Sequence, residues 1–277
     1  MNANSLVTVI VVTYNHRDYI EQSLSSILSQ VSARPIEIIV FDDCSNDGTS
    51  EIIAQYSELY PQIKHERNAE NCFGTLEYYR KIEKLFTDLP QGDLIFYLEG
   101  DDYWIDARKI EKQCAFMDCN PECSFSFHDW TKVRFDGTLM HESMPEVSRR
   151  NYTTQDLRKF NYAWILMGTL CIRRRKIRWP AGLAATLSTD MFLPFIYGGF
   201  GPGYFVTGIG PLAYRQHTTG IWASANTEIK SFHKVRTACA MLAILIASND
   251  KKSAMNVALS RLLPALLSAG LLRTQKN

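Results

Sequence analysis

Short apolar runs separated by segments with helical spacing constrain the fold of this chain more than any other feature. Apolar residues, many of them β-branched, dominate positions 6–13, 36–41 and 94–98. Runs of this length and composition are typical of strands that are buried on both faces. Between them, residues 19–29 and 75–86 repeat apolar side chains at intervals of three and four, which predicts helices with one apolar face. Strands joined in this way by helices predict an α/β fold with a largely parallel sheet.

The size and charge of the chain exclude several classes of protein. Its 277 residues, 46% of them apolar, are enough to bury a full core. A net charge of +1 argues against a dedicated nucleic-acid binder, which would carry a marked basic excess. The polar first residues predict no secretory signal, and the apolar run 238–247 is too short to span a bilayer. Seven scattered cysteines indicate reduced thiols, so we expect a cytoplasmic protein. From its low net charge we expect that it binds no nucleic acid.

Two adjacent carboxylates, Asp101 and Asp102, closely follow the apolar run 94–98. Like charges repel, and partial burial removes the water that screens them. A divalent cation, or the ligand that brings one, would stabilise such a pair. Mg²⁺ and Mn²⁺ prefer hard oxygen ligands together with substrate phosphate oxygens. The pair therefore predicts either metal-assisted binding of a diphosphate or a solvated Gly-Asp-Asp turn with no ligand.

Polar residues also follow the first two apolar runs. Tyr14 comes directly after the first run, and Asp42 and Asp43 come directly after the second. Ligands of open α/β sheets bind outside the carboxyl ends of the strands, so these side chains and the pair 101–102 are expected along one edge. An aromatic ring can stack on a base, and a carboxylate can accept a hydrogen bond from a base N–H. The arrangement predicts a nucleotide diphosphate site, while the alternative for each residue is a turn or a helix cap.

Three segments resemble, in order and spacing, the family 2 glycosyltransferases with the GT-A fold. They are residues 7–15 (VTVIVVTYN), 38–49 (IIVFDDCSNDGT) and 99–102 (EGDD). The resemblance implies the GT-A nucleotide-diphospho-sugar transferase fold, an α/β fold whose mostly parallel mixed sheet is flanked by helices.

The same resemblance implies a division of the chain. The catalytic domain would occupy residues 1–225, with a nucleotide-binding half at 1–130 and an acceptor-binding half at 131–225. Residues 226–277 would form a helical C-terminal extension.

The resemblance further implies roles for the residues at the strand ends. The expected nucleotide-binding residues are Val12, Thr13, Tyr14, Asp43, Arg67 and Asp101. Within that set, Asp43 matches the carboxylate that reads the base, and Asp101 would approach the ribose and the diphosphate. Asp102 is expected to bind the metal cofactor, Mn²⁺ or Mg²⁺. The segment 67–74 around Arg67 fits an ordinary loop and helix start equally well.

Transfer of a sugar with inversion requires a base, because the attacking acceptor hydroxyl must lose a proton as the new bond forms. Asp190 stands just before an apolar helical run and matches the segment that carries this base in the family, so it is the expected catalytic residue. The alternative is a helix cap, since Ser188, Thr189 and Asp190 are all residues that cap helices well.

Further candidates flank the expected diphosphate. By resemblance, His217 is expected to be a second metal ligand and Arg215 a phosphate contact. Asn71 is another candidate phosphate contact, and Trp104 and Trp222 are candidates for stacking on sugar rings. The alternative for the histidine is a structural role, and the alternative for each tryptophan is packing in the core.

The C-terminal residues 258–273 are strongly apolar and carry few charges. They predict either helices that pack on the catalytic domain or on a second copy, giving a homodimer, or an interfacial helix. Such a helix would bring the enzyme to a lipid-linked acceptor by peripheral contact with the inner face of the cytoplasmic membrane. The basic run 173–176 fits either a solvated strand end or a contact with anionic lipid or a phosphorylated acceptor.

By resemblance, the chain is expected to be a metal-dependent inverting glycosyltransferase, a hexosyl- or N-acetylhexosaminyltransferase. Its donor would be a nucleotide-diphosphate sugar, a UDP-sugar, and its acceptor a saccharide or lipid-linked saccharide in capsule, O-antigen or lipopolysaccharide synthesis. A nicotinamide dehydrogenase would need GxGxxG after the first strand, and a pyrophosphorylase a glycine-rich basic loop, and residues 14–18 provide neither. The remaining alternative is a non-catalytic nucleotide-sugar-binding or scaffold protein of the same fold.

Overall fold

A computed structural model describes residues 5–177, 179, 189–217 and 226–272. Its main sheet has seven strands in the order β10-β6-β9-β4-β1-β2-β3. β1 pairs in parallel with both β2 and β4, and only β9 runs antiparallel to its neighbours, so the predicted mixed, mostly parallel sheet is confirmed. The strands are β1 (Val7–Thr13), β2 (Ile36–Asp42), β3 (Ile63–Arg67), β4 (Leu94–Glu99), β6 (Phe125–Phe127), β9 (Cys171–Arg173) and β10 (Gly203–Phe205).

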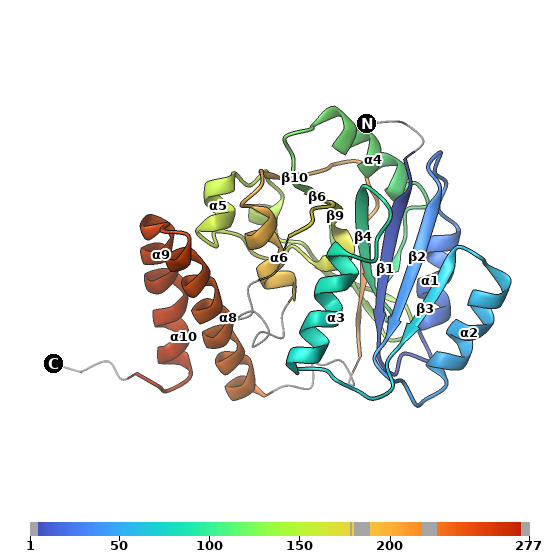
Figure 1. Cartoon of the computed structure of the whole chain (residues 1–277), viewed down its shortest axis with the longest axis horizontal. Helices are drawn as coiled ribbons and strands as arrows, with labels where there is room; N and C mark the ends of the chain where they lie inside the picture. The colour runs from blue at the N-terminus through green and yellow to red at the C-terminus, as the bar shows by residue number, and fades with distance from the viewer. Residues whose placement is uncertain (1–4, 178, 180–188, 218–225, 273–277) are drawn as a thin grey trace.

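Helices cover both faces of this sheet, as the alternating pattern predicted. Figure 1 shows α1 and α2 on one side of β1 and β2 and α3 on the other. The change of side follows from topology, because the chain returns from β3 across the sheet to β4 and such crossovers are right-handed. The helices of this part are α1 (Ile20–Leu28), α2 (Thr49–Leu59), α3 (Leu76–Thr87) and α4 (Lys109–Cys119).

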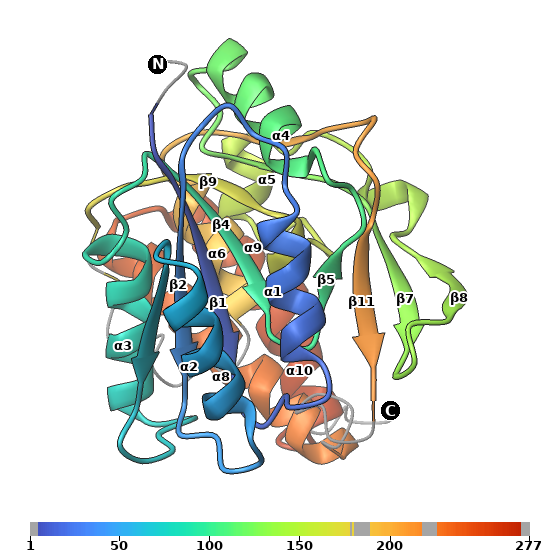
Figure 2. The ribbon, with the colours of Figure 1, turned by 90° about the vertical axis from the view of Figure 1, so that its right-hand side faces the viewer.

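A second, four-stranded sheet lies beside the first, next to α1 (Figure 2). Its order is β5-β11-β7-β8, with bounds β5 (Tyr103–Trp104), β7 (Trp130–Arg134), β8 (Leu139–Ser143) and β11 (Leu212–Gln216). β5 starts directly after the acidic turn and pairs antiparallel with β11. The small sheet is therefore attached to the edge of the large sheet at which the site was predicted.

The middle of the chain has little regular structure. Within residues 163–173 only β9 is extended, and the 3₁₀ turn η2 (Met167–Thr169) precedes it. A Cβ on Gly168 would lie 2.8 Å from Leu212 Cδ2, so this turn passes too close to β11 for any larger residue. Residues 140–154 contain most of β8, the turn η1 (Glu146–Ser148) and the start of α5 (Thr154–Arg158).

The C-terminal part is helical, as expected. α6 (Thr189–Tyr197) precedes β10, and α8 (Thr227–Ala247), α9 (Lys251–Val257), the π-helical turn η4 (Ala258–Leu262) and α10 (Leu263–Ser268) follow. Figure 1 shows α8, α9 and α10 at the end of the molecule opposite β3, with α6 between them and the sheet. Pro264 does not interrupt the helix: it lies in the first turn of α10, directly after the π-helical turn η4, and the helical backbone continues through it. Of the helices in the described ranges, none combines the length and the apolar character needed to cross a bilayer.

Candidate active site

The carboxyl ends of β1, β2 and β4 lie side by side at one edge of the large sheet, as predicted. In the parallel register, Val12 of β1 lies between its neighbours on β2 and β4. Beyond the strands, the amide of Asp43 donates to the carbonyl of Thr13 (3.0 Å), and the amide of Gly100 donates to the carbonyl of Val12 (2.9 Å). The turn that carries Asp43 and the acidic turn are therefore both tied to the end of β1.

Asp42 is fully buried and has a structural role. Its carboxylate accepts hydrogen bonds from the amide and the hydroxyl of Ser45 (2.9 and 2.6 Å) and from the hydroxyl of Ser50, and it lies 3.7 Å from Nε2 of His65. Burial alone would raise the pKa of this carboxyl, but the nearby ring of His65 and the hydrogen bonds from Ser45 and Ser50 outweigh it and lower the pKa to about 2. Asp42 therefore fixes the turn after β2 as a buried, ionised group.

Asp43 is also buried, but only one of its carboxylate oxygens is occupied. Oδ1 accepts hydrogen bonds from the side-chain amide of Asn68 and from the amide and thiol of Cys72 (3.1 Å each). Oδ2 has no hydrogen-bond partner among the described residues, although it is shielded from solvent. A buried carboxylate oxygen with no donor is costly, and an N–H group of a ligand would satisfy it.

Tyr14 lies at the same edge, with 38% of its surface exposed. The residue after it, Asn15, adopts a left-handed backbone conformation with φ 55°. The amide of Asn15 donates to the hydroxyl of Ser45 (2.9 Å), and its side-chain oxygen accepts from the amide of Asn46 (3.0 Å). These two hydrogen bonds connect the loop after β1 to the loop after β2. The backbone of Tyr14 therefore lies beside the turn that carries Asp43.

Arg67 and Asn71 support the same turn. Nε of Arg67 donates to the hydroxyl of Ser50 (2.9 Å), and its guanidinium also donates to the carbonyl of Ser45 (3.2 Å). Nδ2 of Asn71 donates to the backbone carbonyl of Asp43 (3.2 Å). Both side chains thus lie at the predicted nucleotide edge, and their direct contact with a ligand stays a prediction.

The acidic turn brings Asp101 together with two histidines. Oδ2 of Asp101 lies 2.8 Å from Nε2 of His217 and 3.7 Å from Nε2 of His16. One ligand atom from each of the three residues lies within 4.8 Å of the others. A hydrogen bond between the other ring nitrogen of His16, Nδ1, and the hydroxyl of Thr13 (3.2 Å) orients the ring.

The protonation states of this cluster suit a divalent cation. Burial lowers the pKa of His16 although the negative charge of Asp101 acts in the opposite direction, and this shift favours the neutral ring that binds a metal. Burial works against the ionised form of Asp101, but His16 and His217 outweigh it and keep the pKa of its carboxyl below the usual value. An ionised carboxylate beside imidazole nitrogen atoms is a donor set that Mn²⁺ accepts, with room left for phosphate oxygens. The residues present therefore fit the metal expected from the sequence.

Asp102 does not belong to this cluster, which differs from the expectation that it binds the metal. Its side chain is buried, and Oδ1 accepts a hydrogen bond from the amide of Arg215 (2.8 Å). Burial, together with the negative charges of Asp101 and Glu99, raises its pKa well above the usual value. Adjacent residues in the turn present their carboxyl groups to different surroundings, and the one beside the histidines is that of Asp101.

The absence of a side chain at Gly100 allows the acidic turn to pack closely against Thr13 and His16. A Cβ at this position would lie 2.6 Å from the hydroxyl oxygen of Thr13 and 3.0 Å from Nδ1 of His16. The end of β1, the ring of His16 and the acidic turn can therefore approach one another only with glycine here.

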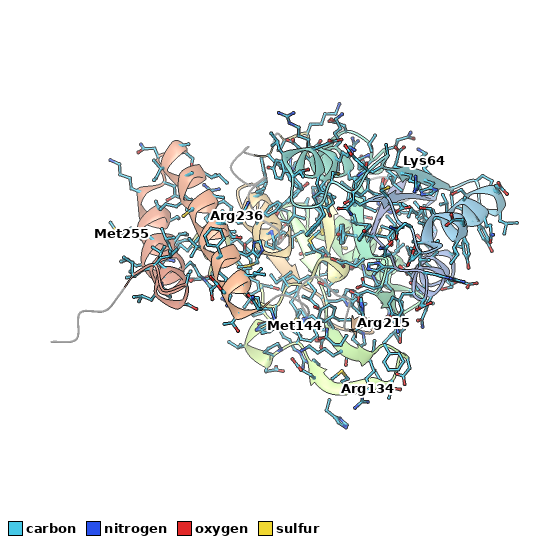
Figure 3. The ribbon with its side chains drawn as sticks, turned by 90° about the horizontal axis from the view of Figure 1, so that it is seen from below. Lys64, Arg134, Met144, Arg215, Arg236 and Met255 are labelled. Carbon is cyan, nitrogen blue, oxygen red and sulfur yellow. The ribbon has the colours of Figure 1, made fainter. Side chains whose placement is uncertain are left out.

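Arg215 holds the acidic turn in place and is not positioned as the expected phosphate contact. Its side chain is buried and donates to the backbone carbonyls of Asp101 (2.8 Å) and Phe135 (2.6 Å) and to the side chain of Gln22. The guanidinium carbon also lies 4.8 Å from the ring centre of Tyr19. In the view from below, Arg215 lies beside Arg134 of β7 (Figure 3). With these partners, Arg215 joins β11, α1 and β7 around the turn.

Three further candidates have different outcomes. Trp104 is buried, and its Nε1 donates to the carbonyl of Gly168 (2.9 Å), so it packs in the core rather than facing a sugar. Asp190 lies in the first turn of α6, but its side chain is outside what the structure describes. Trp222 lies outside the described residues.

His16 is the candidate site residue that the sequence reasoning missed. The available signal was its spacing, since it stands three residues after Thr13 in the turn that follows the first strand. Asn68 and Cys72, which orient Asp43, were likewise not predicted, because a side chain that holds another residue carries no motif of its own.

Comparison with known proteins identifies relatives of this chain. The model of the family described as glycosyl transferase family 2 matches residues 8–180. An uncharacterised protein of Mycobacterium tuberculosis is 27% identical over 230 residues, which are 83% of this chain and 64% of that protein. The putative teichuronic acid biosynthesis glycosyltransferase TuaG of Bacillus subtilis is 37% identical over 137 residues, 50% of this chain and 51% of TuaG.

A third relative carries a more specific name. It is the UDP-Glc:alpha-D-GlcNAc-diphosphoundecaprenol beta-1,3-glucosyltransferase WfaP of Escherichia coli, 31% identical over 144 residues, 52% of this chain and 53% of WfaP. The chain therefore spans between about half and two thirds of the length of these relatives.

Solved structures share the fold. Residues 1–349 of S. aureus TarS in complex with UDP-GlcNAc superpose with a TM-score of 0.61 at 18% identity, covering 85% of this chain and 66% of that one. The mannosyltransferase PcManGT of Pyrobaculum calidifontis, in complex with GDP-Man and Mn²⁺, gives a TM-score of 0.54 at 17% identity and covers 98% of this chain and 76% of that one. At these identities the similarity establishes the architecture alone.

Proposed function

This chain belongs to glycosyl transferase family 2, and we propose that it transfers a hexosyl or N-acetylhexosaminyl unit from a UDP-sugar to a saccharide acceptor with inversion. One observation carries the proposal. A buried carboxylate oxygen on Asp43, which has no hydrogen-bond partner in the described part of the chain, and the cluster of Asp101, His16 and His217 occupy the same edge of one sheet.

We propose that Asp43 reads the base. A uracil ring carries an N–H group that can donate to Oδ2 of Asp43, and the exposed ring of Tyr14 can stack on the base. Oδ1 cannot rotate into this role without losing its bonds to Asn68 and Cys72. The similarity to a relative named as a UDP-glucose transferase and to a structure that binds UDP-GlcNAc supports uridine as the nucleoside.

We assign the metal to Asp101 and His217, with His16 as the third group, in place of the earlier expectation for Asp102. Nitrogen ligands favour Mn²⁺ over Mg²⁺, because Mg²⁺ takes mainly oxygen ligands. When bound there, the cation would neutralise the negative charge of the departing diphosphate. Thr13 orients His16 through its hydroxyl, and the bond of His217 to Asp101 orders the end of β11 against the acidic turn.

Asp190 is proposed as the base that accepts the proton of the acceptor hydroxyl. In the proposed step, the acceptor oxygen forms a bond to the anomeric carbon while the bond from that carbon to the diphosphate oxygen breaks, and UDP leaves with that electron pair. The position of Asp190 in the first turn of α6 and its match to the segment that carries the family's base support the assignment.

The acceptor is proposed to be a lipid-linked saccharide used to build a cell-surface polysaccharide. WfaP is named for a diphosphoundecaprenol acceptor and TuaG for teichuronic acid, which supports this class. We place the reaction in the cytoplasm, a setting that agrees with seven cysteines that are all free thiols.

The test is release of UDP from a panel of UDP- and GDP-sugars by the purified protein, with Mn²⁺, with Mg²⁺ and with a chelator. We expect UDP release only with a UDP-sugar and a divalent cation, and Asp190→Asn should retain donor binding while losing transfer. Binding of UDP without release in any combination would favour the alternative, a non-catalytic nucleotide-sugar-binding protein of this fold.

A further inference from the structure

The C-terminal helices expose a continuous apolar stripe on their outer side. Side chains four residues apart along α9, η4 and α10 are between 38% and 63% exposed. The stripe consists of Met255, Leu259, Leu263 and Leu267. Figure 3 labels Met255 on the side of these helices that faces away from the sheets. A soluble helix normally buries such a row of long aliphatic side chains, so the stripe indicates an interaction surface.

The opposite side of the same helices is already in contact with the rest of the molecule. Ala254, Val257 and Ala265 are buried. Nδ2 of Asn256 donates to the carbonyl of Lys159 (2.8 Å), and the guanidinium of Arg261 donates to the carbonyl of Phe160 (2.6 Å). Packing on the catalytic domain, one of the two roles expected from the sequence, therefore uses the inner side and leaves the outer stripe uncovered.

Charge is divided unevenly between the two parts of the chain. Residues 226–277 contain eight Lys and Arg against two Asp and Glu, a net charge of +6. Residues 1–225 therefore carry a net charge of −5. The exposed side chains of Lys251 and Lys252 lie one turn before Met255, at the start of the stripe. One of the two acidic residues, Asp250, lies 3.9 Å from Arg158 and caps the first turn of α9.

From these observations we propose that helices α8 to α10 dock on an anionic lipid bilayer, with the stripe inserted at the headgroup level. Apolar side chains beside lysines are the combination that binds such an interface. A second copy is the weaker candidate, because a two-fold dimer through this surface would bring two segments of charge +6 together. The role of the docking rests on the proposed function, because docking would bring the candidate active site to a lipid-linked acceptor.

The test is flotation of the full chain with vesicles of phosphatidylcholine alone and with about 30% phosphatidylglycerol, at low and high salt. We expect about tenfold stronger binding to the anionic vesicles, weakened by salt. The double substitution Leu259→Ser and Leu263→Ser should reduce this binding about tenfold with an unchanged melting temperature. Leu139→Ser is the matched control, because Leu139 is 62% exposed on β8, away from these helices.

Several outcomes would overturn the proposal. The first three are no binding of the native chain to vesicles, equal binding of the native chain to both kinds of vesicle, and binding of the double variant equal to that of the native chain. The fourth is a native chain that does not bind vesicles and forms a dimer in solution, which the double substitution converts to a monomer. UDP release by the native chain without vesicles is measured in parallel. Release without docking would overturn the docking alone, and docking without release would overturn the proposed function alone.

Discussion

Nε2 of His217 lies 2.8 Å from Oδ2 of Asp101, although 116 residues separate the two in sequence. The contact joins the last described residue after β11 to the turn after β4. It selects Asp101 rather than its neighbour as the carboxylate that faces the proposed metal site.

Substitution of Asp101 should therefore reduce the activity much more than substitution of Asp102. Asp101→Asn should reduce metal-dependent UDP release about 100-fold, because it removes the ionised ligand, with little change in melting temperature. Asp102→Asn should keep most of the activity, because a raised pKa makes the neutral amide a fair mimic of this carboxyl and its oxygen can still accept from the amide of Arg215. Activity lost only in Asp102→Asn would restore the original assignment of the metal to Asp102.

Asp43→Asn should weaken UDP binding about 10- to 100-fold, because an amide can present an N–H group where the base needs an acceptor. Isothermal titration calorimetry with UDP measures the change. Asp136→Asn, at an exposed turn between β7 and β8, is the control and should bind UDP as the native chain does. Equal affinity in Asp43→Asn would remove Asp43 from the nucleotide site.

Stability should depend on pH through Asp42. Its folded pKa of about 2 lies below the value of 3.8 for an unperturbed carboxyl, so its contribution is fully present above about pH 4 and is lost as the pH falls from 3.8 towards 2. The shift corresponds to about 2 kcal/mol in the free energy of unfolding. Asp42→Asn should be less stable than the native chain by about that amount at pH 7 in urea unfolding, and the difference should shrink near pH 3. A difference that stays constant over this range would contradict the low folded pKa.

Gly100→Ala should destabilise the site, because the added Cβ would lie 2.6 Å from the hydroxyl oxygen of Thr13. We expect a loss of about 1–3 kcal/mol in stability and weaker activation by Mn²⁺, since the ring of His16 must also move. Thermal melting and Mn²⁺ titration of UDP release measure the two effects. Gly199→Ala, where the nearest atom would be 3.2 Å away, is a control remote from the site.

Arg215→Lys should lower the melting temperature and the activity together. Lysine cannot bond the carbonyls of Asp101 and Phe135 at once with the geometry of a guanidinium, so we expect a loss of about 2–3 kcal/mol. Arg80→Lys, on the exposed side of α3, is the control. Weaker UDP binding without any loss of stability would instead support the phosphate contact expected from the sequence.

The sequence predicted the large sheet and its edge because both depend on local patterns. The buried runs at β1, β2 and β4 have a clear apolar composition, and parallel strands bring their carboxyl ends together whatever follows them. These two patterns alone place Tyr14, Asp43 and the acidic turn at one edge of the sheet.

What could not be predicted depends on contacts between distant residues. Asp101 and Asp102 are chemically identical neighbours, and their roles are separated by His217 and by the amide of Arg215, 113 residues beyond Asp102. Trp104 is a residue type that often stacks on sugars, but here its indole is buried in the core and donates a hydrogen bond to the carbonyl of Gly168. The side chain of Asp190 lies outside the described part of the chain, so its role stays a prediction.

The uneven division of charge between residues 1–225 and 226–277 makes the whole molecule an electric dipole. Near a negatively charged surface, the field would exert a torque that turns α8 to α10 forward before any side chain makes contact. Encounters would then begin from a narrow range of orientations, and the frequency of productive collisions would fall steeply as added salt shortens the distance over which the field acts.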